Sequence, residues 1–272
     1  MRVLRGEVSE FQRWLQKSER FAVLTGAGVS AESGIPTFRG PGGLWRQYSA
    51  VELATPQAWS ENPGLVWEFY NYRRVLMGEK RPNPAHLALA KIEKEFQKLG
   101  KAFTLITQNI DDLHLEAGSQ NLIRLHGSLW EVRCVRCAKV SPNREVPITP
   151  AFAGTGGVEG NGPSKAFREA DLPHCSECGG LLRPHVVWFG EMLDPEVLAS
   201  AQKAALEAEL FLVVGTSAVV YPAAGLVELA AQGGAKIAVV NLDVPVSHRF
   251  LDFVFEGAAG EILPSLLQFP DS

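Results

Sequence analysis

Short, unbroken runs of apolar residues recur along this chain, and each run is bounded by a polar or glycine-containing turn. Strands that are apolar on both faces are typical of parallel sheets that helices cover on both sides. Stretches with apolar residues at helical spacing separate the runs. The expected strands cover residues 21–24, 103–106, 210–214, 237–240 and 253–255, and the expected helices cover 8–15, 84–96 and 195–209. The sequence therefore predicts an α/β fold with a doubly wound parallel sheet.

The composition is that of a globular protein and gives no sign of a nucleic-acid or membrane partner. Lys and Arg number 26 against 30 Asp and Glu, so the net charge of −4 gives no general attraction to nucleic acid or anionic lipid. The uncharged stretch 210–227 contains Gly, Thr, Ser and Pro, whereas a membrane-spanning helix needs about 20 mostly apolar residues. We interpret it as a strand, a polar turn and a helix. The N-terminus shows no apolar targeting segment, which predicts a cytoplasmic location.

Two segments interrupt the alternation of strands and helices. Residues 41–83 carry an aromatic-rich helical pattern, and residues 131–181 contain all four cysteines together with many Gly and Pro. Such compositions favour insertions over further strands of the parallel core. We expect a large domain formed by 1–40, 84–130 and 182–272, and a smaller domain formed by a helical module at 41–83 and a metal-binding module at 131–181.

The four cysteines form two Cys-x-x-Cys pairs, Cys134 with Cys137 and Cys175 with Cys178. Two such pairs supply four thiolates for a tetrahedral zinc ion, and a shell of four thiolates leaves no open coordination position. The sequence thus predicts one structural zinc ion that takes no part in catalysis. The gap between the pairs exceeds the usual spacing of about 15 to 20 residues, which indicates an insertion. Two disulfides or two redox-active pairs are the alternatives.

The first apolar run ends in a glycine turn, Gly26-Ala27-Gly28, that begins a G-x-G-x-x-G/A pattern. Glycine lets the backbone approach a pyrophosphate, and a following helix N-terminus offers N–H donors to it. Gly34 and Pro36 break any long helix after this turn, so the fingerprint of a dehydrogenase is incomplete. A glycine-terminated strand that binds no ligand is the alternative.

Polar residues follow other apolar runs, at the points where the strands are expected to end. One cluster is 107–111, another is 215–217, and Asn241 follows a third run. Ligands of α/β proteins bind at the carboxyl ends of parallel strands, although each cluster alone also fits a capping turn. His126 is the best general-base candidate because the ordinary pKa of histidine lies near neutrality, and a structural role is its alternative.

Together these residues resemble the sirtuins, the NAD-dependent protein lysine deacylases, over almost the whole chain. The motifs that carry the resemblance stand in the family's order: GAGVSAESGIPTFRG at 26–40, TQNID at 107–111, HG at 126–127, the two Cys-x-x-Cys pairs, VVWFGE at 186–191, GTS at 215–217 and Asn241. The resemblance implies a Rossmann-like large domain and a small domain built from the helical module and a zinc ribbon. NAD and acyl-lysine are implied to meet between the two.

The resemblance also implies roles for individual residues. His126 is the implied catalytic base, and Asp111 is implied to bond the carboxamide of nicotinamide. The residues implied to bind NAD are Gly26, Ala27, Gly28, Glu32, Ser33, Phe38, Arg39, Gln108, Asn109, Ile110, Asp111, Gly215, Thr216, Ser217, Asn241, Leu242 and Ala259. The strand Val187-Trp188-Phe189-Gly190-Glu191 is implied to pair with the substrate main chain. The implied reaction consumes NAD and yields nicotinamide and O-acyl-ADP-ribose.

Tyr70 and Arg73 indicate which acyl group is removed. They are three residues apart, so on a helix both point to one side, and a phenol beside a guanidinium suits a carboxylate. The alternative is a solvated arginine beside a packed tyrosine. The Y-x-x-R pattern is similar to that of class III sirtuins, which remove succinyl, malonyl and glutaryl groups, and the small Ala54 matches their wide acyl pocket. We expect substrate binding by Ala54, Tyr70, Arg73 and residues 187–191.

Other activities are compatible with the same motifs. The alternatives are an NAD-dependent deacetylase, an ADP-ribosyltransferase, and a non-catalytic zinc-ribbon module that senses NAD. The expected partners are acyl-lysine proteins or peptides, with neither nucleic acid nor membrane, and the oligomeric state is left open. Because animal class III members can be mitochondrial, a mitochondrial location after loss of a transit peptide is the alternative to a cytoplasmic one.

Overall fold

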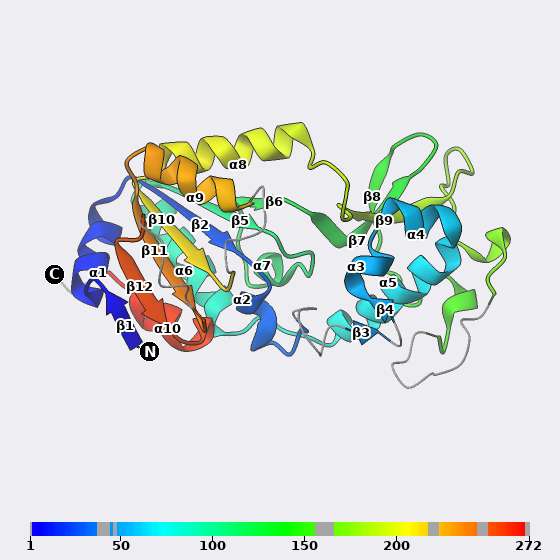
Figure 1. The fold of residues 1–272 in the computed structure, drawn as a ribbon, viewed down its shortest axis with the longest axis horizontal. Coiled ribbons are helices and arrows are strands. Elements are labelled where there is room, and N and C mark those ends of the chain that lie inside the picture. Colours follow the sequence, from blue (N-terminus) through cyan, green and yellow to red (C-terminus); the bar gives the residue numbers. More distant parts are fainter. Residues whose placement is uncertain are drawn as a thin grey trace.

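The structure is a computed structural model that describes residues 2–36, 44–45, 48–155, 166–216, 223–243 and 250–269. It has two parts, which lie side by side along the longest axis (Figure 1). The larger part, at the left of the figure, is a seven-stranded sheet with helices on both faces. The smaller part, at the right, combines helices with a three-stranded sheet.

The large sheet has the strand order β1-β12-β11-β10-β2-β5-β6. Its strands are β1 (Arg2–Arg5), β2 (Arg20–Thr25), β5 (Ala102–Thr107), β6 (Leu122–Arg124), β10 (Leu210–Val214), β11 (Lys236–Asn241) and β12 (Phe253–Glu256). All neighbouring strands are parallel except β1, which pairs antiparallel with β12. Every apolar run that was predicted as a strand lies in this sheet, so the predicted doubly wound α/β class is confirmed.

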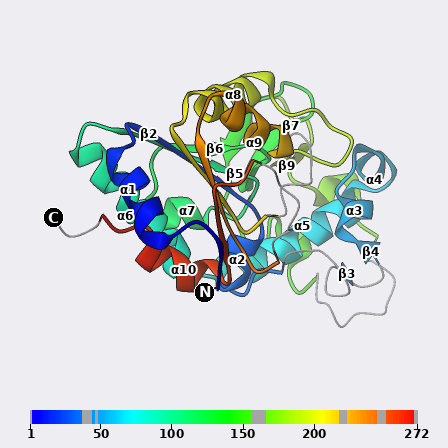
Figure 2. The same cartoon turned by 60° about the vertical axis from the view of Figure 1, so that its left-hand side comes forward.

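Helices cover both faces of the large sheet, and each face has its own apolar core (Figure 2). On one face lie α1 (Val8–Lys17), α6 (Pro84–Lys98) and α10 (Ala259–Leu266), and on the other lie α8 (Pro195–Glu207) and α9 (Ala223–Gln232). The start of α6 is fixed locally, because Asn83 accepts the N–H of Ala85 and Pro84 occupies the first turn. Among the described residues, each helix is too short or too polar to cross a membrane.

The smaller part has a separate apolar core. Its elements are the pair β3 (Leu44–Trp45) and β4 (Tyr48–Ser49), the helices α3 (Ala50–Leu53), α4 (Pro56–Glu61) and α5 (Pro63–Gly78), and the antiparallel sheet of β8 (Val140–Pro142), β7 (Gly127–Cys134) and β9 (Leu182–Val186). Asn62 starts α5 by accepting the N–H of Leu65. Gly127 pairs with Val186 in this sheet, so its strands extend a few residues into segments that the sequence analysis placed in the large domain.

Two details differ from the sequence expectations. The segment β1, which begins and ends with arginine, forms an antiparallel edge strand that no apolar run predicted. Residues 187–191 are a turn, so their prediction as a strand is wrong: β9 ends at Val186, and Glu191 N–H bonds back to the Trp188 carbonyl at 2.9 Å. Gly190 closes this turn with a φ of +85°, which glycine adopts without steric cost.

Candidate active site

Two glycine turns meet where the large sheet changes its direction of winding. From β2, the chain adds β5 and β6 on one side and later adds β10, β11 and β12 on the other. Gly26 N–H donates to the Val214 carbonyl, and Gly28 N–H donates to the Gly215 carbonyl at 2.8 Å. Open α/β sheets bind ligands at such a switch point, beyond the carboxyl ends of the strands. The turns after β2 and β10 therefore mark the candidate site.

The close approach of these turns requires glycine at two positions. A Cβ on Gly28 would lie 2.7 Å from the Gly215 carbonyl oxygen, and a Cβ on Gly215 would lie 2.3 Å from the Val29 nitrogen. Gly215 also has a φ of +61°, in the left-handed region. The following helix, α2 (Gly28–Ala31), has four residues, as the predicted break requires. A bare backbone at the switch point suits the close approach of a pyrophosphate, so the turn fits NAD.

A buried polar network joins the glycine turn to the segment after β5. The Ser30 hydroxyl donates to Asp111 Oδ2 at 2.8 Å and accepts a side-chain N–H of Asn109 at 3.1 Å. Asn109 also donates to the Gly26 carbonyl at 3.1 Å. Burial raises the pKa of the Asp111 carboxyl, while its bonds from Leu113 N–H and Ser30 lower it. The structure thus brings two of the predicted motifs, separated in sequence, into direct contact.

Two buried histidines extend this network, and the sequence analysis did not single them out. His86 on α6 and His114 on α7 (Leu113–Glu116) have ring centroids 4.7 Å apart and are 0% and 2% exposed. Asn83 N–H donates to His86 Nδ1, which assigns the ring proton to Nε2, 3.3 Å from Ser30 Oγ. His86 Nε2–H therefore donates to the Ser30 hydroxyl, and the Ser30 hydroxyl donates to Asp111. The position of His86 three residues after a helix-capping asparagine was the available sequence signal.

Burial keeps both histidines neutral. It lowers the pKa of His86 to about 4. It also places the pKa of His114 well below the ordinary value, and the adjacent His86 lowers it further. His114 Nε2 lies 3.0 Å from Thr25 Oγ1, whereas its Nδ1 is buried without a hydrogen-bond partner in the described part of the chain. A second proton on this ring would have no acceptor, which agrees with the direction of the shift.

His126 is half-buried in the loop between β6 and β7. Its Nδ1 lies 2.8 Å from the Gln108 carbonyl oxygen. A carbonyl accepts and never donates, so Nδ1 carries the proton and Nε2 carries the lone pair. Burial lowers the pKa of the imidazole, and the bond to Gln108 opposes that shift. A neutral ring with its lone pair on Nε2 has the form that a general base requires.

Several residues that were predicted to bind NAD make structural contacts of their own. Glu32 Oε2 accepts the N–H of Gly260, in the first turn of α10, at 2.6 Å. Ser33 Oγ accepts a side-chain N–H of Asn83 at 3.0 Å. Ala259 is buried in the core of the large part. These three residues have a role in holding α2, α6 and α10 together whether or not a ligand is bound.

The adenosine side of the predicted site lies at the ends of β10 and β11. Thr216 is buried beside Gln108, whose side-chain amide lies 3.4 Å from Thr216 Oγ1. Asn241 donates to the Asp243 carbonyl at 2.9 Å, and Leu242 is 66% exposed. Phe38, Arg39 and Ser217 lie outside the described residues.

Tyr70 and Arg73 lie on α5, as the sequence predicts. Tyr70 is fully buried, and the Arg73 guanidinium lies 5.7 Å from the Tyr70 ring centroid. Burial lowers the pKa of Arg73, while Tyr70 and Asp111 raise it. The guanidinium stays cationic because its ordinary pKa exceeds about 12. The electrostatic interaction between Arg73 and Asp111 places this cation near the buried polar network.

The residues predicted to receive the acyl group converge on one apolar cluster. Ala54, Tyr70 and Trp188 belong to it together with Ile110, which was predicted to bind NAD, and the four residues come from separate segments. Phe189 N–H donates to the Ala54 carbonyl at 2.9 Å. Val187 N–H donates to the His126 carbonyl at 3.1 Å. The turn at 187–191 therefore links the candidate base to the candidate acyl pocket.

The four cysteine sulfurs form one cluster whose Sγ atoms lie within 4.8 Å of one another. Cys134 Sγ is 3.4 Å from Cys178 Sγ, and Cys137 Sγ is 3.9 Å from Cys175 Sγ. Tetrahedral zinc with Zn–S bonds of about 2.3 Å places the sulfurs about 3.8 Å apart, whereas a disulfide needs about 2.05 Å. The donor set fits a structural zinc ion, and the alternative of two disulfides is wrong.

Arg74 fastens α5 to the zinc-binding module, a role that the sequence analysis missed. It is 0% exposed, its Nε donates to the Leu129 carbonyl at 3.1 Å, and its Nη1 donates to Asn143 Oδ1 at 2.5 Å. On the same helix, Asn71 Oδ1 accepts the N–H of Ile148 at 2.9 Å. The orientation of α5, and so of its phenol and guanidinium, depends on the module that holds the cysteines.

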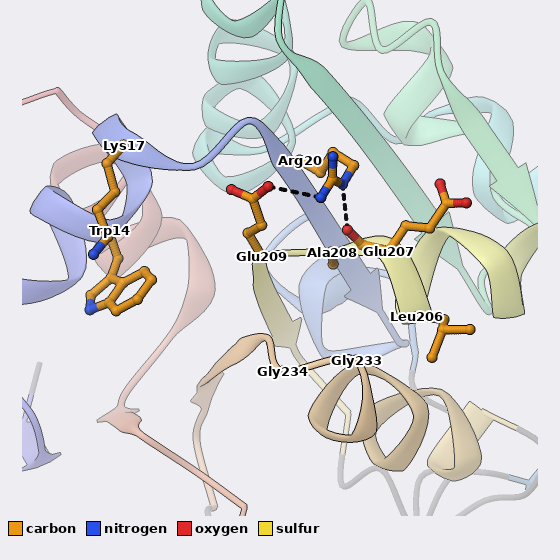
Figure 3. A pocket seen from close by; sticks show the side chains of 9 residues that line it. All are labelled: Trp14, Lys17, Arg20, Leu206, Glu207, Ala208, Glu209, Gly233 and Gly234. Carbon is orange, nitrogen blue, oxygen red and sulfur yellow. Dashed lines mark hydrogen bonds and ion pairs between the residues drawn. The ribbon is translucent and has the colours of Figure 1, made fainter.

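A hollow of about 610 Å³ lies at the opposite end of the sheet, near the amino ends of β2 and β10 (Figure 3). The charges around it are satisfied within the chain. Arg20 bonds Glu209 at 2.9 Å and the Glu207 carbonyl at 2.6 Å, and the Lys17 ammonium lies 3.2 Å from the Trp14 ring centroid. Such self-paired charges offer a ligand little, so the switch point at the carboxyl ends is the better candidate site.

Comparisons with known proteins identify the relatives of this chain. The chain matches the Sir2 family over residues 26–222. It is 49% identical over 263 residues to an NAD-dependent protein deacylase of Daphnia pulex, covering 96% of each chain. It is 46% identical over 269 residues to the mitochondrial NAD-dependent protein deacylase sirtuin-5 of Danio rerio, covering 98% of this chain and 88% of the relative.

Solved structures of Sir2 proteins are also similar to this chain. A Sir2 homologue in complex with NAD is 43% identical, with a TM-score of 0.80, and the match covers 95% of this chain and 92% of that chain. A Sir2 complex with a p53 peptide and NAD+ is 33% identical, with a TM-score of 0.77, and the match covers 95% of this chain and 96% of that chain.

Proposed function

Because this chain belongs to the Sir2 family, we propose that it is an NAD-dependent protein lysine deacylase that removes negatively charged acyl groups. The resemblance to sirtuins is thereby confirmed. The expected substrates are succinyl-, malonyl- and glutaryl-lysine in proteins or peptides, and the expected products are free lysine, nicotinamide and O-acyl-ADP-ribose. Relatives of 46 to 49% identity that are named deacylases support this activity.

The preference for acidic acyl groups rests on the Tyr70 and Arg73 pair. Both side chains lie on α5, the phenol in the same apolar cluster as Ala54 and Trp188, and the guanidinium within electrostatic reach of Asp111. Burial raises the pKa of Tyr70, so the phenol keeps its proton and can donate it. A cation and a neutral donor at one place match a carboxylate, whereas an acetyl group presents a methyl there.

The residues of the candidate site have distinct proposed roles. When bound, NAD supplies a ribose carbon whose leaving group, nicotinamide, already carries positive charge. Asp111, held by Ser30, would accept the carboxamide N–H of that leaving group, and the glycine turns would receive the pyrophosphate. His126 would take a proton from a ribose hydroxyl on Nε2, because its Nδ1–H is engaged by Gln108.

The cysteine cluster has a structural role in this proposal. A zinc ion held by Cys134, Cys137, Cys175 and Cys178 has no position left for substrate. It would fix the three-stranded sheet on which β7 and β9 lead to His126 and to the turn at 187–191. The small domain proposed here comprises the helical module at 41–83 and this zinc module at 131–181, with the first and last strands of its sheet extending to Gly127 and Val186.

A panel of acyl-lysine peptides tests the proposed function. The same peptide carrying acetyl, succinyl, malonyl or glutaryl is incubated with NAD, and nicotinamide release and peptide mass are followed together. We expect faster turnover of the acidic acyl peptides, with deacylated peptide and nicotinamide formed in equal amounts. If the acetyl peptide is turned over as fast as the succinyl peptide or faster, the preference for acidic acyl groups is wrong and the protein is a deacetylase. A mass increase of the peptide would indicate ADP-ribosyl transfer instead.

Two variants accompany the panel. Arg73→Met removes the cation that pairs with the carboxylate and should lower succinyl turnover by about tenfold or more, as expected for loss of a bond to a charged group. His126→Ala should abolish deacylation while leaving NAD binding measurable by calorimetry, because the base does not hold the dinucleotide. Deacylation that persists in His126→Ala would contradict the assignment of the base.

The cellular location is a separate question. The Danio rerio relative is named mitochondrial, which supports a mitochondrial location, whereas the N-terminal sequence was the basis for the expected cytoplasmic one. Imaging of the chain with a C-terminal tag decides between the two compartments.

A further inference from the structure

The oxygen of Tyr70 is surrounded by groups that donate hydrogen bonds. The indole Nε1–H of Trp188 donates to Tyr70 Oη at 2.9 Å, and both side chains are buried. The Arg73 guanidinium lies over the same phenol, 5.7 Å from its ring centroid, and interacts with it electrostatically. Neither an indole nor a guanidinium can accept a hydrogen bond. The phenol oxygen therefore accepts the indole N–H, and because neither Trp188 nor Arg73 can accept the phenol proton, that proton must point toward a third group.

The indole that makes this contact is held firmly in place. The Arg183 guanidinium lies 3.3 Å from the Trp188 ring centroid. Both terminal nitrogens of Arg183 bond the Glu191 carboxylate, at 2.5 and 2.9 Å, and the same carboxylate accepts the backbone N–H of Trp188 at 2.8 Å. Trp59 packs on the indole with ring centroids 5.7 Å apart. A donor fixed by a bidentate ion pair and by ring packing offers its N–H in one direction.

We propose that Trp188 is a positioning residue for acyl specificity: its indole N–H occupies the acceptor side of Tyr70 and so directs the phenol proton toward the carboxylate of an acidic acyl group. The inference rests on the proposed function and adds a residue that acts through Tyr70. A buried hydroxyl proton needs an acceptor, and the acyl carboxylate beside Arg73 supplies one. An acetyl group has no such acceptor and gains nothing from this orientation.

A double-mutant cycle tests the proposal. Trp188→Phe keeps an aromatic ring and removes the N–H, while Tyr70→Phe removes the hydroxyl. We expect Trp188→Phe to lower kcat/KM for the succinyl peptide by about tenfold, mainly through KM, and to lower the ratio of succinyl to acetyl turnover by the same factor. In the Tyr70→Phe background the same change should alter succinyl kcat/KM by less than about twofold, because the hydroxyl it orients is gone.

A matched control removes a neighbouring indole that does not touch the phenol. Trp59→Phe keeps an aromatic ring that can pack on Trp188, so it should leave the succinyl-to-acetyl ratio unchanged. If Trp188→Phe does not fold, replacement of Trp188 by 3-benzothienylalanine preserves the shape of the indole, removes the N–H, and carries the same expectation. Zinc content and far-UV circular dichroism establish that each variant is folded.

Three results separate the inference from the function on which it rests. Trp188→Phe could lower kcat/KM equally in both backgrounds, or equally for the succinyl and acetyl peptides. Either result would show that the indole acts through packing. It would overturn the proposed role of Trp188 and leave the proposed function intact. A wild-type enzyme that prefers acetyl-lysine would overturn both the inference and the acidic acyl preference. A loss confined to the succinyl peptide and to the background with Tyr70 supports the proposal.

Discussion

Acidification should destabilise this protein through the buried histidine pair. His86 is 0% exposed, and burial lowers its pKa to about 4, against an ordinary value near 6.5 in the unfolded chain. Between these two values the unfolded chain binds a proton that the folded chain does not. The free energy of unfolding therefore falls as the pH drops from about 6.5 to about 4 and is fully retained above that window.

The size of the effect follows from the shift. A difference of about 2.5 pKa units corresponds to about 3 kcal/mol at about 1.4 kcal/mol per unit. His114 acts in the same direction, because its pKa is also depressed by burial. A loss of this size is a large fraction of the about 5 to 15 kcal/mol that holds a typical domain folded.

Urea unfolding of the wild type and of His86→Gln, followed from pH 7.5 to pH 4.5 with zinc present, measures this linkage. Glutamine retains a side-chain N–H that can serve Ser30 but does not titrate. Protonation of the cysteine thiolates and loss of zinc affect both proteins, so the difference between them isolates His86. We expect the wild type to lose about 2 to 3 kcal/mol more than His86→Gln by pH 4.5. A difference that is constant across this range would refute the assignment of a buried, neutral His86.

Three further perturbations test other parts of the structure. Arg74→Met keeps the apolar stem but removes the bonds to Leu129 and Asn143, so it should lower the Tm by about 6 to 10 °C and reduce succinyl turnover, whereas the exposed Arg168→Met should do neither. Gly215→Ala forces a Cβ to within 2.3 Å of a backbone nitrogen and should weaken NAD binding in calorimetry by about tenfold or more; unchanged affinity would contradict the close approach of the two turns. Cys175→Ser should abolish zinc binding by elemental analysis and lower the Tm, and full zinc occupancy in this variant would disprove the four-thiolate site.

The sequence by itself determined the local elements and the chemistry of the motifs. The apolar runs became β2, β5, β10, β11 and β12, because a strand buried on both faces needs apolar side chains at every position. Asn83 and Asn62 set the starts of α6 and α5 through contacts within three residues. The paired cysteines predicted one thiolate cluster, because their spacing suits a single tetrahedral ion.

The tertiary structure decided which distant side chains meet and in what direction they donate. Trp188 is 118 residues from Tyr70 in sequence, and no periodicity reports that their polar atoms lie 2.9 Å apart. Periodicity also did not predict the contact between His86 and His114, the hydrogen bonds from Arg74 to Leu129 and Asn143, or the turn at 187–191. Spacing along the chain predicts which face of its own helix or strand a residue lies on. Its contacts with distant segments depend on the strand order and on the packing of the two parts.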